Sequence, residues 1–320
     1  MKLYFAPLEG ITDGVYRRAH CKMFGGVDKY FAPFISPSAG FRVTHREKRQ
    51  LLSDRDANYT VVPQLLIGKP DALEEILPRL ADAGFTEINL NLGCPSGTVT
   101  AKGKGAGLLR EIDALRTLLD ALFALPCGLA VSAKTRIGFS DASEWEGLWQ
   151  IYCAYPFSEL IVHARTREEY YRGRTHPDAL ALCCGAPFPV IFNGDLFSPE
   201  DVQGIEKAYP ELGGVMLGRG LVANPALSRL LRGGEALTIS ELKRFHDALC
   251  DAYAEEMPFK ALHGRMCEIM SYVCCCLDSA KKPLKQLRKA QTLADYRTRA
   301  EALFAICDLK QQPWFDPLNL

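Results

Sequence analysis

The first candidate for a chemically active residue in this 320-residue chain is Cys94, which follows a predicted strand. Ile88–Leu92 alternates apolar and polar residues, which is typical of a half-buried strand, and Cys94 follows directly after Gly93. The segment beyond Cys94 is basic and rich in glycine, and such loops at strand ends often carry catalytic groups. The alternative is a small apolar residue that merely ends a strand.

Other polar residues end neighbouring apolar runs. Gln64, Lys134 and His163 each occupy such a position, and buried lysine or histidine needs an acceptor or an anion as a partner. Together they suit a ring of polar groups around a planar heterocycle. Glycines in Asn193–Asp195 and Gly218–Gly220 let backbone N–H groups approach an anion, so we expect a phosphate-bearing ligand there.

These residues need a scaffold that places strand ends together, and the chain repeats one unit of strand, turn and helix. Eight candidate strands cover 3–6, 29–34, 60–66, 87–92, 129–135, 159–163, 189–193 and 214–217. Helical spacing between them covers 71–83, 112–125, 144–154, 177–184, 199–209 and 225–231. Eight such units predict an α/β fold, a (β/α)8 TIM barrel, with a doubly wound open sheet as the alternative. Pro78 suggests a kink or an early stop in its helix.

The pattern changes after Gly234, because helical spacing alone continues from residue 239 to the end. We therefore predict a barrel domain at 1–235 and a small all-α domain at 236–320, with Ser240 as the N-cap of its first helix. Residues 260–299 contain nine Lys or Arg against three acids. This excess is either a solvated helix face or a docking surface for a nucleic acid.

Composition restricts which classes of protein this chain can belong to. The formal net charge is zero and 48% of residues are hydrophobic, as in ordinary globular proteins. No apolar run is long enough for a transmembrane helix or a signal peptide, so we expect a cytoplasmic protein without membrane contact. A monomer is a separate expectation, which no sequence feature tests. None of the twelve cysteines has C-x-x-C spacing, which favours reduced thiols and no metal over an iron–sulfur or zinc site.

An ordered set of motifs resembles the bacterial tRNA-dihydrouridine synthases. The motifs are APLEGITD, VPQLLIG, NLNLGCPS, GKGAGLL, AKTRIG, VHARTREEYYRG, FNGD and GVMLGRG, which run through all eight candidate strands in order. The helical tail is also similar to the RNA-binding domain of that family. One such motif alone is weak evidence, but the ordered set is specific.

The resemblance implies an FMN-dependent oxidoreductase that reduces the C5=C6 bond of particular uridines in tRNA, with NADPH as the reductant. Cys94 would be the general acid that protonates C5. The implied flavin contacts are Pro7, Leu8, Gln64, Lys134, His163, Asn193, Gly194, Asp195, Gly218 and Arg219. The target base must leave its stack, which favours an RNA loop as substrate. Candidate RNA contacts are Lys102, Lys104, Arg136, Arg165, Arg167, Tyr170, Arg265, Lys281, Lys282, Lys285 and Arg288.

Two positions depart from the family pattern. Leu8 stands where methionine is usual, and Cys267 stands where relatives commonly have lysine, so part of the RNA surface differs. Two other classes stay open at this point. One is a barrel flavoenzyme that reduces a small pyrimidine, and the other is a non-catalytic RNA-binding protein.

Overall fold

The computed structural model describes residues 1–37 and 58–310. Its parallel sheet has the order β3-β2-β1-β9-β8-β7-β6-β5-β4. The strands are β1 (Lys2–Phe5), β2 (Lys29–Phe31), β3 (Thr60–Val62), β4 (Gln64–Leu65), β5 (Glu87–Leu92), β6 (Ala130–Gly138), β7 (Glu159–Thr166), β8 (Val190–Asn193) and β9 (Gly214–Leu217).

Pro63 divides one barrel strand into β3 and β4, and this strand closes the sheet. On one side Ala32 and Ile35 donate N–H bonds to Val62 and Gln64, and on the other Asn89 donates to Pro63. The divided strand thus pairs with both ends of the strand order, which leaves a ring of eight. The predicted TIM barrel is confirmed, and the open sheet is excluded by this closure.

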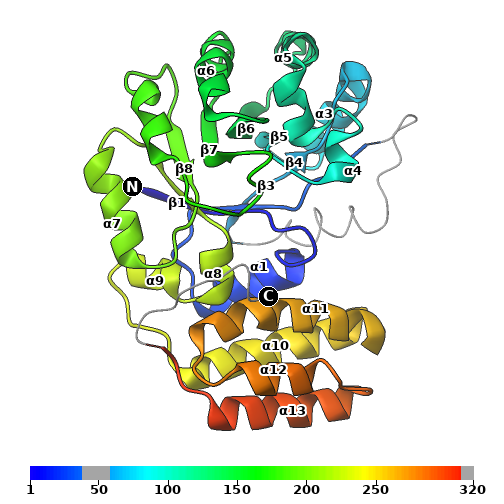
Figure 1. Cartoon of the computed structure of the whole chain (residues 1–320). Helices are drawn as coiled ribbons and strands as arrows, with labels where there is room; N and C mark the ends of the chain where they lie inside the picture. The colour runs from blue at the N-terminus through cyan, green and yellow to red at the C-terminus, as the bar shows by residue number, and fades with distance from the viewer. Residues whose placement is uncertain (38–57, 311–320) are drawn as a thin grey trace. The chain divides into compact units, whose positions relative to one another are not determined.

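Amphipathic helices line the outside of the barrel strands, as Figure 1 shows for α3, α5 and α6. In α5 (Ile112–Ala124) the buried residues Leu115, Leu118, Leu119 and Leu122 recur at helical spacing. The helix α3 (Leu73–Asp82) continues past Pro78, so the suggested early stop is wrong. Pro78 is exposed, and water can therefore bind the carbonyl that the proline leaves unpaired. Two further helices of the barrel are α6 (Trp145–Cys153) and α7 (Pro199–Ala208). The stretch predicted to be helical at 177–184 is a 3₁₀ helix, η4 (Pro177–Cys183).

The glycine-rich segment after Cys94 is more ordered than a plain loop. It forms the short helix α4 (Gly97–Thr100) and the 3₁₀ helix η2 (Gly105–Arg110). Two further 3₁₀ helices, η1 (Pro70–Ala72) and η3 (Ala142–Glu144), begin α3 and α6.

The chain divides into two compact units. The barrel unit comprises Met1–Pro7, Asp28–Gly194 and Gly204–Met216, and the helical unit comprises Leu8–Val27, Asp195–Gln203 and Leu217–Leu320. The described helices of the helical unit are α1 (Gly14–Met23), α8 (Arg219–Ala223), α9 (Leu227–Leu231), α10 (Ile239–Glu256), α11 (Phe259–Val273), η5 (Cys274–Cys276), α12 (Lys281–Leu287) and α13 (Leu293–Ile306). Figure 1 shows α10 to α13 side by side, in yellow to red.

Aromatic contacts join α1 to α10 within the helical unit. The Phe245 ring meets Tyr16 at 5.4 Å and Phe24 at 5.2 Å between centroids, both edge to face. The N-cap of α10 is Thr238 and not Ser240, so that prediction is wrong. Thr238 and Glu241 form a capping box, each side chain accepting the other residue's backbone N–H at 3.2 Å.

Candidate active site

A column of buried amides runs through the barrel interior. Gln64 Nε2 donates to Asn89 Oδ1 at 2.7 Å, and Asn91 Nδ2 donates to Gln64 Oε1 at 2.7 Å. Asn89 Nδ2 then donates to the hydroxyl of Ser132 at 3.0 Å. Alternation along β5 directs Asn89 and Asn91 to the same face, and Gln64 lies on the neighbouring strand β4 in register with Asn89. Gln64 is only 1% exposed, and a buried amide needs hydrogen-bond partners. These two bonds supply them.

The amide column ends at Cys94. Asn91 Oδ1 accepts the backbone N–H of Gly93 at 3.1 Å and that of Cys94 at 2.9 Å. On the other side, Ala106 N–H donates to the Cys94 carbonyl at 3.1 Å. Gly105 has φ of 55°, and a Cβ there would lie 3.0 Å from the Cys94 Cβ. The backbone of Cys94 is thus held from two directions, while the residue keeps a partly exposed surface.

Two cations of β6 lie beside Cys94. Burial and the neighbouring Arg136 charge together lower the pKa of Lys134 to about 7, and Cys94 opposes the shift. Within residues 1–37 and 58–310, nothing accepts a hydrogen bond from Lys134 Nζ. An amine in this position suits an anionic or hydrogen-bond-accepting ligand.

Arg136 binds the protein itself. It is 1% exposed, and it donates to the carbonyls of Gly93 at 2.9 Å, Thr166 at 2.7 Å and Tyr170 at 2.8 Å. In this arrangement Arg136 joins the segment of Cys94 to the loop that follows β7.

The end of β7 places His163 in the same part of the barrel. Its buried ring lies 5.9 Å from the ring of Tyr171, and Arg165 Nη1 lies 3.5 Å from His163 Nε2. Arg165 is also buried, and it donates to the carbonyls of Arg172 at 3.2 Å and Gly173 at 2.7 Å. The loop after β7 is therefore held by two buried arginines, Arg136 and Arg165.

The end of β8 presents Asn193 and Gly194. Asn193 Nδ2 donates to the Met216 carbonyl of β9 at 2.8 Å. Gly194 has φ of 148°, and a Cβ there would lie 2.8 Å from Thr175 Cγ2, so only glycine fits. Pro7, also in the barrel unit, follows the carboxyl end of β1.

Within the helical unit, Asp195 and Gly218–Gly220 come together. Arg219 Nη2 donates to Asp195 Oδ1 at 2.6 Å, and Gly218 is the N-cap of α8. Gly220 packs so closely on Leu196 that a Cβ would meet its carbonyl oxygen at 2.0 Å. Leu8 N–H is bound by the Thr12 hydroxyl at 2.8 Å.

The candidate RNA contacts differ in their surroundings. Lys102 is exposed, whereas Lys104 Nζ donates to the Ser36 hydroxyl at 2.8 Å. Arg265 of α11 is paired with the carboxylate of Asp13, which also accepts from the Tyr253 hydroxyl at 2.8 Å.

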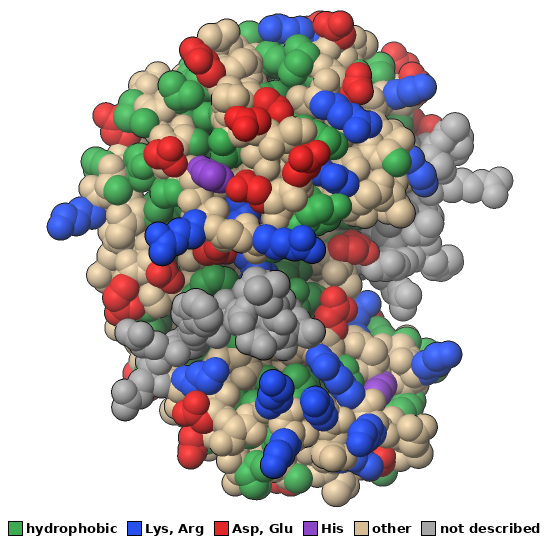
Figure 2. Space-filling view, viewed as in Figure 1, with side chains coloured by type: hydrophobic (Ala, Val, Ile, Leu, Met, Phe, Trp, Pro, Cys, Tyr) green, Lys and Arg blue, Asp and Glu red, His purple; other side chains and the backbone are tan. Residues whose placement is uncertain are grey.

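Lys281, Lys282 and Lys285 of α12 are exposed, as is Arg288, whose Nη2 binds the Ser271 hydroxyl at 2.7 Å. Figure 2 shows Lys and Arg side chains gathered over this part of the helical unit.

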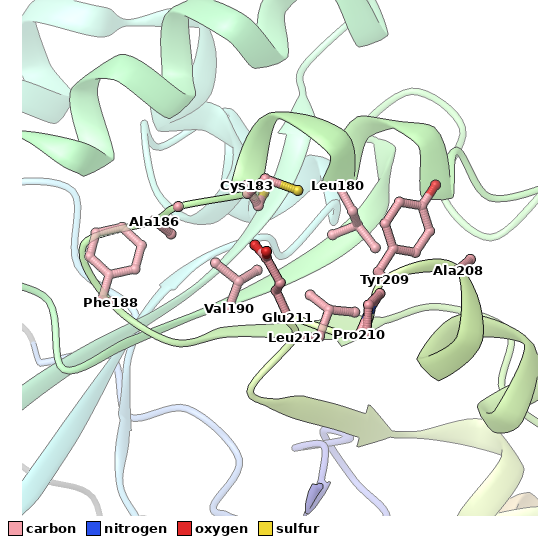
Figure 3. A pocket seen from close by; sticks show the side chains of 12 residues that line it. Leu180, Cys183, Ala186, Phe188, Val190, Ala208, Tyr209, Pro210, Glu211 and Leu212 are labelled. Atoms are coloured by element: carbon pink, nitrogen blue, oxygen red, sulfur yellow. The ribbon is translucent and has the colours of Figure 1, made fainter.

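A cavity of about 410 Å³ lies at the amino-terminal ends of β8 and β9, away from Cys94. Figure 3 shows Leu180, Val190 and Leu212 pointing into it, with Cys183 and Glu211 beside them. Burial raises the pKa of the Cys183 thiol to about 12, so this cysteine is a poor nucleophile. Cys183 thus resembles a core residue more than a reactive one.

Neither Asn89 nor Asn91 is among the site residues that the sequence analysis selects. The alternation Asn89-Leu90-Asn91 was a usable signal, because two amides on the interior face of a barrel strand need partners.

The fold and the polar ends of its strands define a parallel α/β barrel enzyme scaffold. An old yellow enzyme homologue from Zymomonas mobilis is similar, with a TM-score of 0.53, 10% identity, and coverage of 74% of this chain and 90% of that one. The old yellow enzyme of Trypanosoma cruzi matches with a TM-score of 0.50 and 10% identity, over 72% and 88% of the two chains. At these identities the likeness shows the fold alone.

Sequence comparison is more specific. The model of the dihydrouridine synthase (Dus) family matches residues 4–307, and this chain belongs to that family of oxidoreductases. The tRNA-dihydrouridine(16) synthase of Cupriavidus necator is 34% identical over 247 residues, which cover 72% of this chain and 74% of that protein. A probable tRNA-dihydrouridine synthase of Staphylococcus epidermidis is 30% identical over 321 residues, covering 96% and 95%.

The described residues contain neither a candidate membrane-spanning helix nor a candidate metal-binding cluster. No helix there is both long and apolar enough to span a membrane. The same residues include no group of three or more His, Cys, Asp or Glu arranged to hold a metal ion. All twelve cysteines are free thiols.

Proposed function

We propose that the protein is a tRNA-dihydrouridine synthase that reduces the C5=C6 bond of uridine in tRNA, with FMN as cofactor and NADPH as reductant. Membership of the family supports the activity and the tRNA substrate. The single observation that carries the chemistry is the position of Cys94. Its backbone is fixed by Asn91, and it lies beside the amine of Lys134, which has no hydrogen-bond partner among the described residues.

The barrel unit suits a flavin. Lys134 has an amine without a hydrogen-bond partner in the described chain, and Gln64 on β4 and His163 on β7 are buried. We assign Gln64, Lys134 and His163 to the flavin ring and Asn193 and Gly194 to its tail. Pro7, Leu8, Asp195, Gly218 and Arg219 remain predicted contacts. Bound FMN would supply a hydride to C6 of the uracil.

Cys94 would then hold the proton that C5 receives. Asn91 fixes the backbone of Cys94, so the thiol would approach the base from a constant direction. The positive charges of Lys134 and Arg136 lie near the sulfur and would stabilise the thiolate left after proton transfer.

The substrate would be an unpaired uridine, because a base must be extruded before it can enter a barrel. The exposed Lys102, Lys281, Lys282, Lys285 and Arg288 would attract phosphates without reading sequence. Position 16 is the first uridine to test, since the names of two relatives carry that number. The domain at 236–320 is proposed as the RNA-binding part.

The test compares wild type, Cys94→Ala and Cys184→Ala. Cys184 is an exposed thiol beside the cavity of Figure 3 and serves as the matched control. We expect all three proteins to bind flavin, measured by visible absorbance. Only wild type and Cys184→Ala should form dihydrouridine in unmodified tRNA with NADPH.

Other outcomes would contradict the proposal. NADPH consumption with a free pyrimidine and none with tRNA would favour the small-molecule reductase. Bound tRNA without flavin absorbance would favour a non-catalytic RNA-binding protein. Mapping of the product in tRNA variants that lack U16 would decide the position.

A further inference from the structure

Four side chains form a ladder in which arginines and aromatic rings alternate. The Arg110 guanidinium lies 4.9 Å from the ring centroid of Phe139, and the Arg167 guanidinium lies 5.2 Å from the same ring. Arg167 also lies 5.0 Å from the ring of Tyr170. Each of these distances is within the range of a cation–π contact. The order Arg110, Phe139, Arg167, Tyr170 thus brings two positive charges and two rings into one stack.

The ladder belongs to the catalytic end of the barrel unit. Phe139 follows the carboxyl end of β6, and Arg167 follows that of β7. Arg167 Nη2 lies 3.4 Å from the hydroxyl of Thr100, in the segment that follows Cys94. Arg167 Nε is buried, and in the described part of the chain it has no hydrogen-bond partner.

Tyr170 at the end of the ladder has an unusual backbone. Its φ is 52°, in the left-handed region that bulky side chains seldom adopt. Such a conformation costs free energy and persists only where the surroundings impose it. Here Arg136 donates to the Tyr170 carbonyl at 2.8 Å, and the Tyr170 N–H donates to the Arg167 carbonyl at 3.1 Å. Glu169 steadies the same turn by accepting the Thr166 N–H at 2.7 Å.

The strain has no compensation in core packing, because Tyr170 is 37% exposed. Glycine would adopt this backbone more easily, and the exposed ring does not fill the interior. A strained, exposed aromatic residue held by a buried arginine indicates a function for the ring itself.

We propose that Tyr170 is a stacking platform for an unpaired base of the substrate RNA, with Arg167 and Arg110 attracting the adjoining phosphates. This inference rests on the proposed function and deepens it. Every base has a π face, so an exposed ring binds unpaired bases with little sequence preference. A stack that carries two guanidinium groups suits a polyanion better than an apolar protein partner.

Substitutions at Tyr170 separate the ring from the backbone. Tyr170→Gly and Tyr170→Asn both remove the ring and tolerate a positive φ, so the protein should stay folded. Tyr170→Phe keeps the ring. We expect the KM for tRNA, and the Kd measured without NADPH, to rise about 5- to 150-fold in the Gly and Asn variants. Tyr170→Phe should match wild type, and kcat should stay within about twofold in all three.

A second arm tests the charges. Arg110→Gln should lower the slope of log Kd against log salt by about 0.7, the value for one phosphate contact on single-stranded RNA. Arg116→Gln, an exposed arginine of α5, is the control and should leave the slope unchanged.

An unchanged KM and Kd in both the Gly and Asn variants would overturn the platform. So would a loss in Tyr170→Phe as large as that in Tyr170→Gly, because the ring would then be insufficient. Failure of the proposed function is recognised separately, as a wild-type protein that makes no dihydrouridine. If that protein still binds tRNA, the Kd of the variants tests the platform alone, and if it does not bind tRNA, both proposals fall.

Discussion

Replacement of Asn91 tests whether the amide column holds Cys94 in place. Asn91→Leu keeps the shape of the side chain but removes its two bonds to the N–H groups of Gly93 and Cys94 and its bond to Gln64. Gln64 Oε1 is buried, and an unsatisfied buried acceptor costs about 1–3 kcal/mol. The two N–H groups lie in a partly exposed segment where water can replace Asn91, so each bond contributes about 0.5–1 kcal/mol. The expected loss of stability is about 2–5 kcal/mol.

Thermal unfolding followed by circular dichroism measures this loss. An unfolding entropy of about 2.1 cal/mol/K per residue gives about 1.5 °C per kcal/mol for 320 residues, so Tm should fall by about 3–8 °C. The kcat for dihydrouridine formation, measured at a temperature where the variant is folded, should fall about 100-fold, because the thiol is no longer aimed. Asn58→Leu, at an exposed position, is the control and should change stability by less than about 0.5 kcal/mol.

Asn91→Asp separates the acceptor from the donor. A carboxylate can still accept both N–H groups but cannot donate to Gln64, so this variant should lose less kcat than Asn91→Leu. The reasoning is refuted if Asn91→Leu keeps both Tm and kcat near the wild-type values, since the column would then not position Cys94.

Two further predictions concern Lys134, whose pKa is lowered, and the ion pair between Arg265 and Asp13. In flavin-free protein, stability should rise from pH 7 toward pH 10.5. The pKa of Lys134 is about 7 in the folded chain and has its ordinary value of 10.5 in the unfolded chain, so the unfolded chain binds more protons in this window. Urea titrations across this range should show the rise in wild type and not in Lys134→Met, and equal slopes would contradict it. Arg265→Met should lower Tm by several degrees because it leaves the half-buried Asp13 without its cation. A double-mutant cycle with Asp13→Asn, melted in parallel, should give coupling above about 1 kcal/mol, and additivity of the two changes would refute the pair.

Local patterns in the sequence predict the barrel well. Alternation in Glu87–Leu92 and the regular return of strand and helix determine which residues face inward and which strand ends meet. Cys94, Lys134 and His163 could therefore be selected as neighbours in one site. The prediction of the N-cap at Ser240 failed because Thr238, two residues earlier, has Glu241 at the spacing of a capping box.

Contacts that depend on register and tertiary packing could not be predicted. Gln64 meets Asn91 only because β4 pairs with β5 in one particular register. Asp13 and Arg265 are 252 positions apart, and Arg265 alone looked like any other base of a charged helix. Tyr170 gave no sign of its positive φ, because a tyrosine codes for no such conformation.

Charged side chains at the amino-terminal ends of the barrel strands determine which way each amide group of the column is turned. Burial raises the pKa of Glu87, but Lys29, which binds Glu87 at 2.6 Å and Glu159 at 2.9 Å, opposes that shift and favours the charged form. An ionised carboxylate only accepts, so the Ser132 hydroxyl is the donor, either to Glu87 at 2.8 Å or to the Ile88 carbonyl at 3.1 Å. The Ser132 oxygen is then left to accept from Asn89 Nδ2, which turns the Asn89 oxygen toward Gln64.

The same constraint passes along the rest of the column. Gln64 must donate to Asn89, which leaves Gln64 Oε1 to accept from Asn91 Nδ2. Asn91 Oδ1 is then free to accept the N–H groups of Gly93 and Cys94. If Glu87 were neutral, the Ser132 hydroxyl could turn and every amide above it could reverse, which would present N–H to N–H at Cys94. A charge at the amino-terminal end of the barrel thus favours the amide orientation that holds the backbone of Cys94 at the other end.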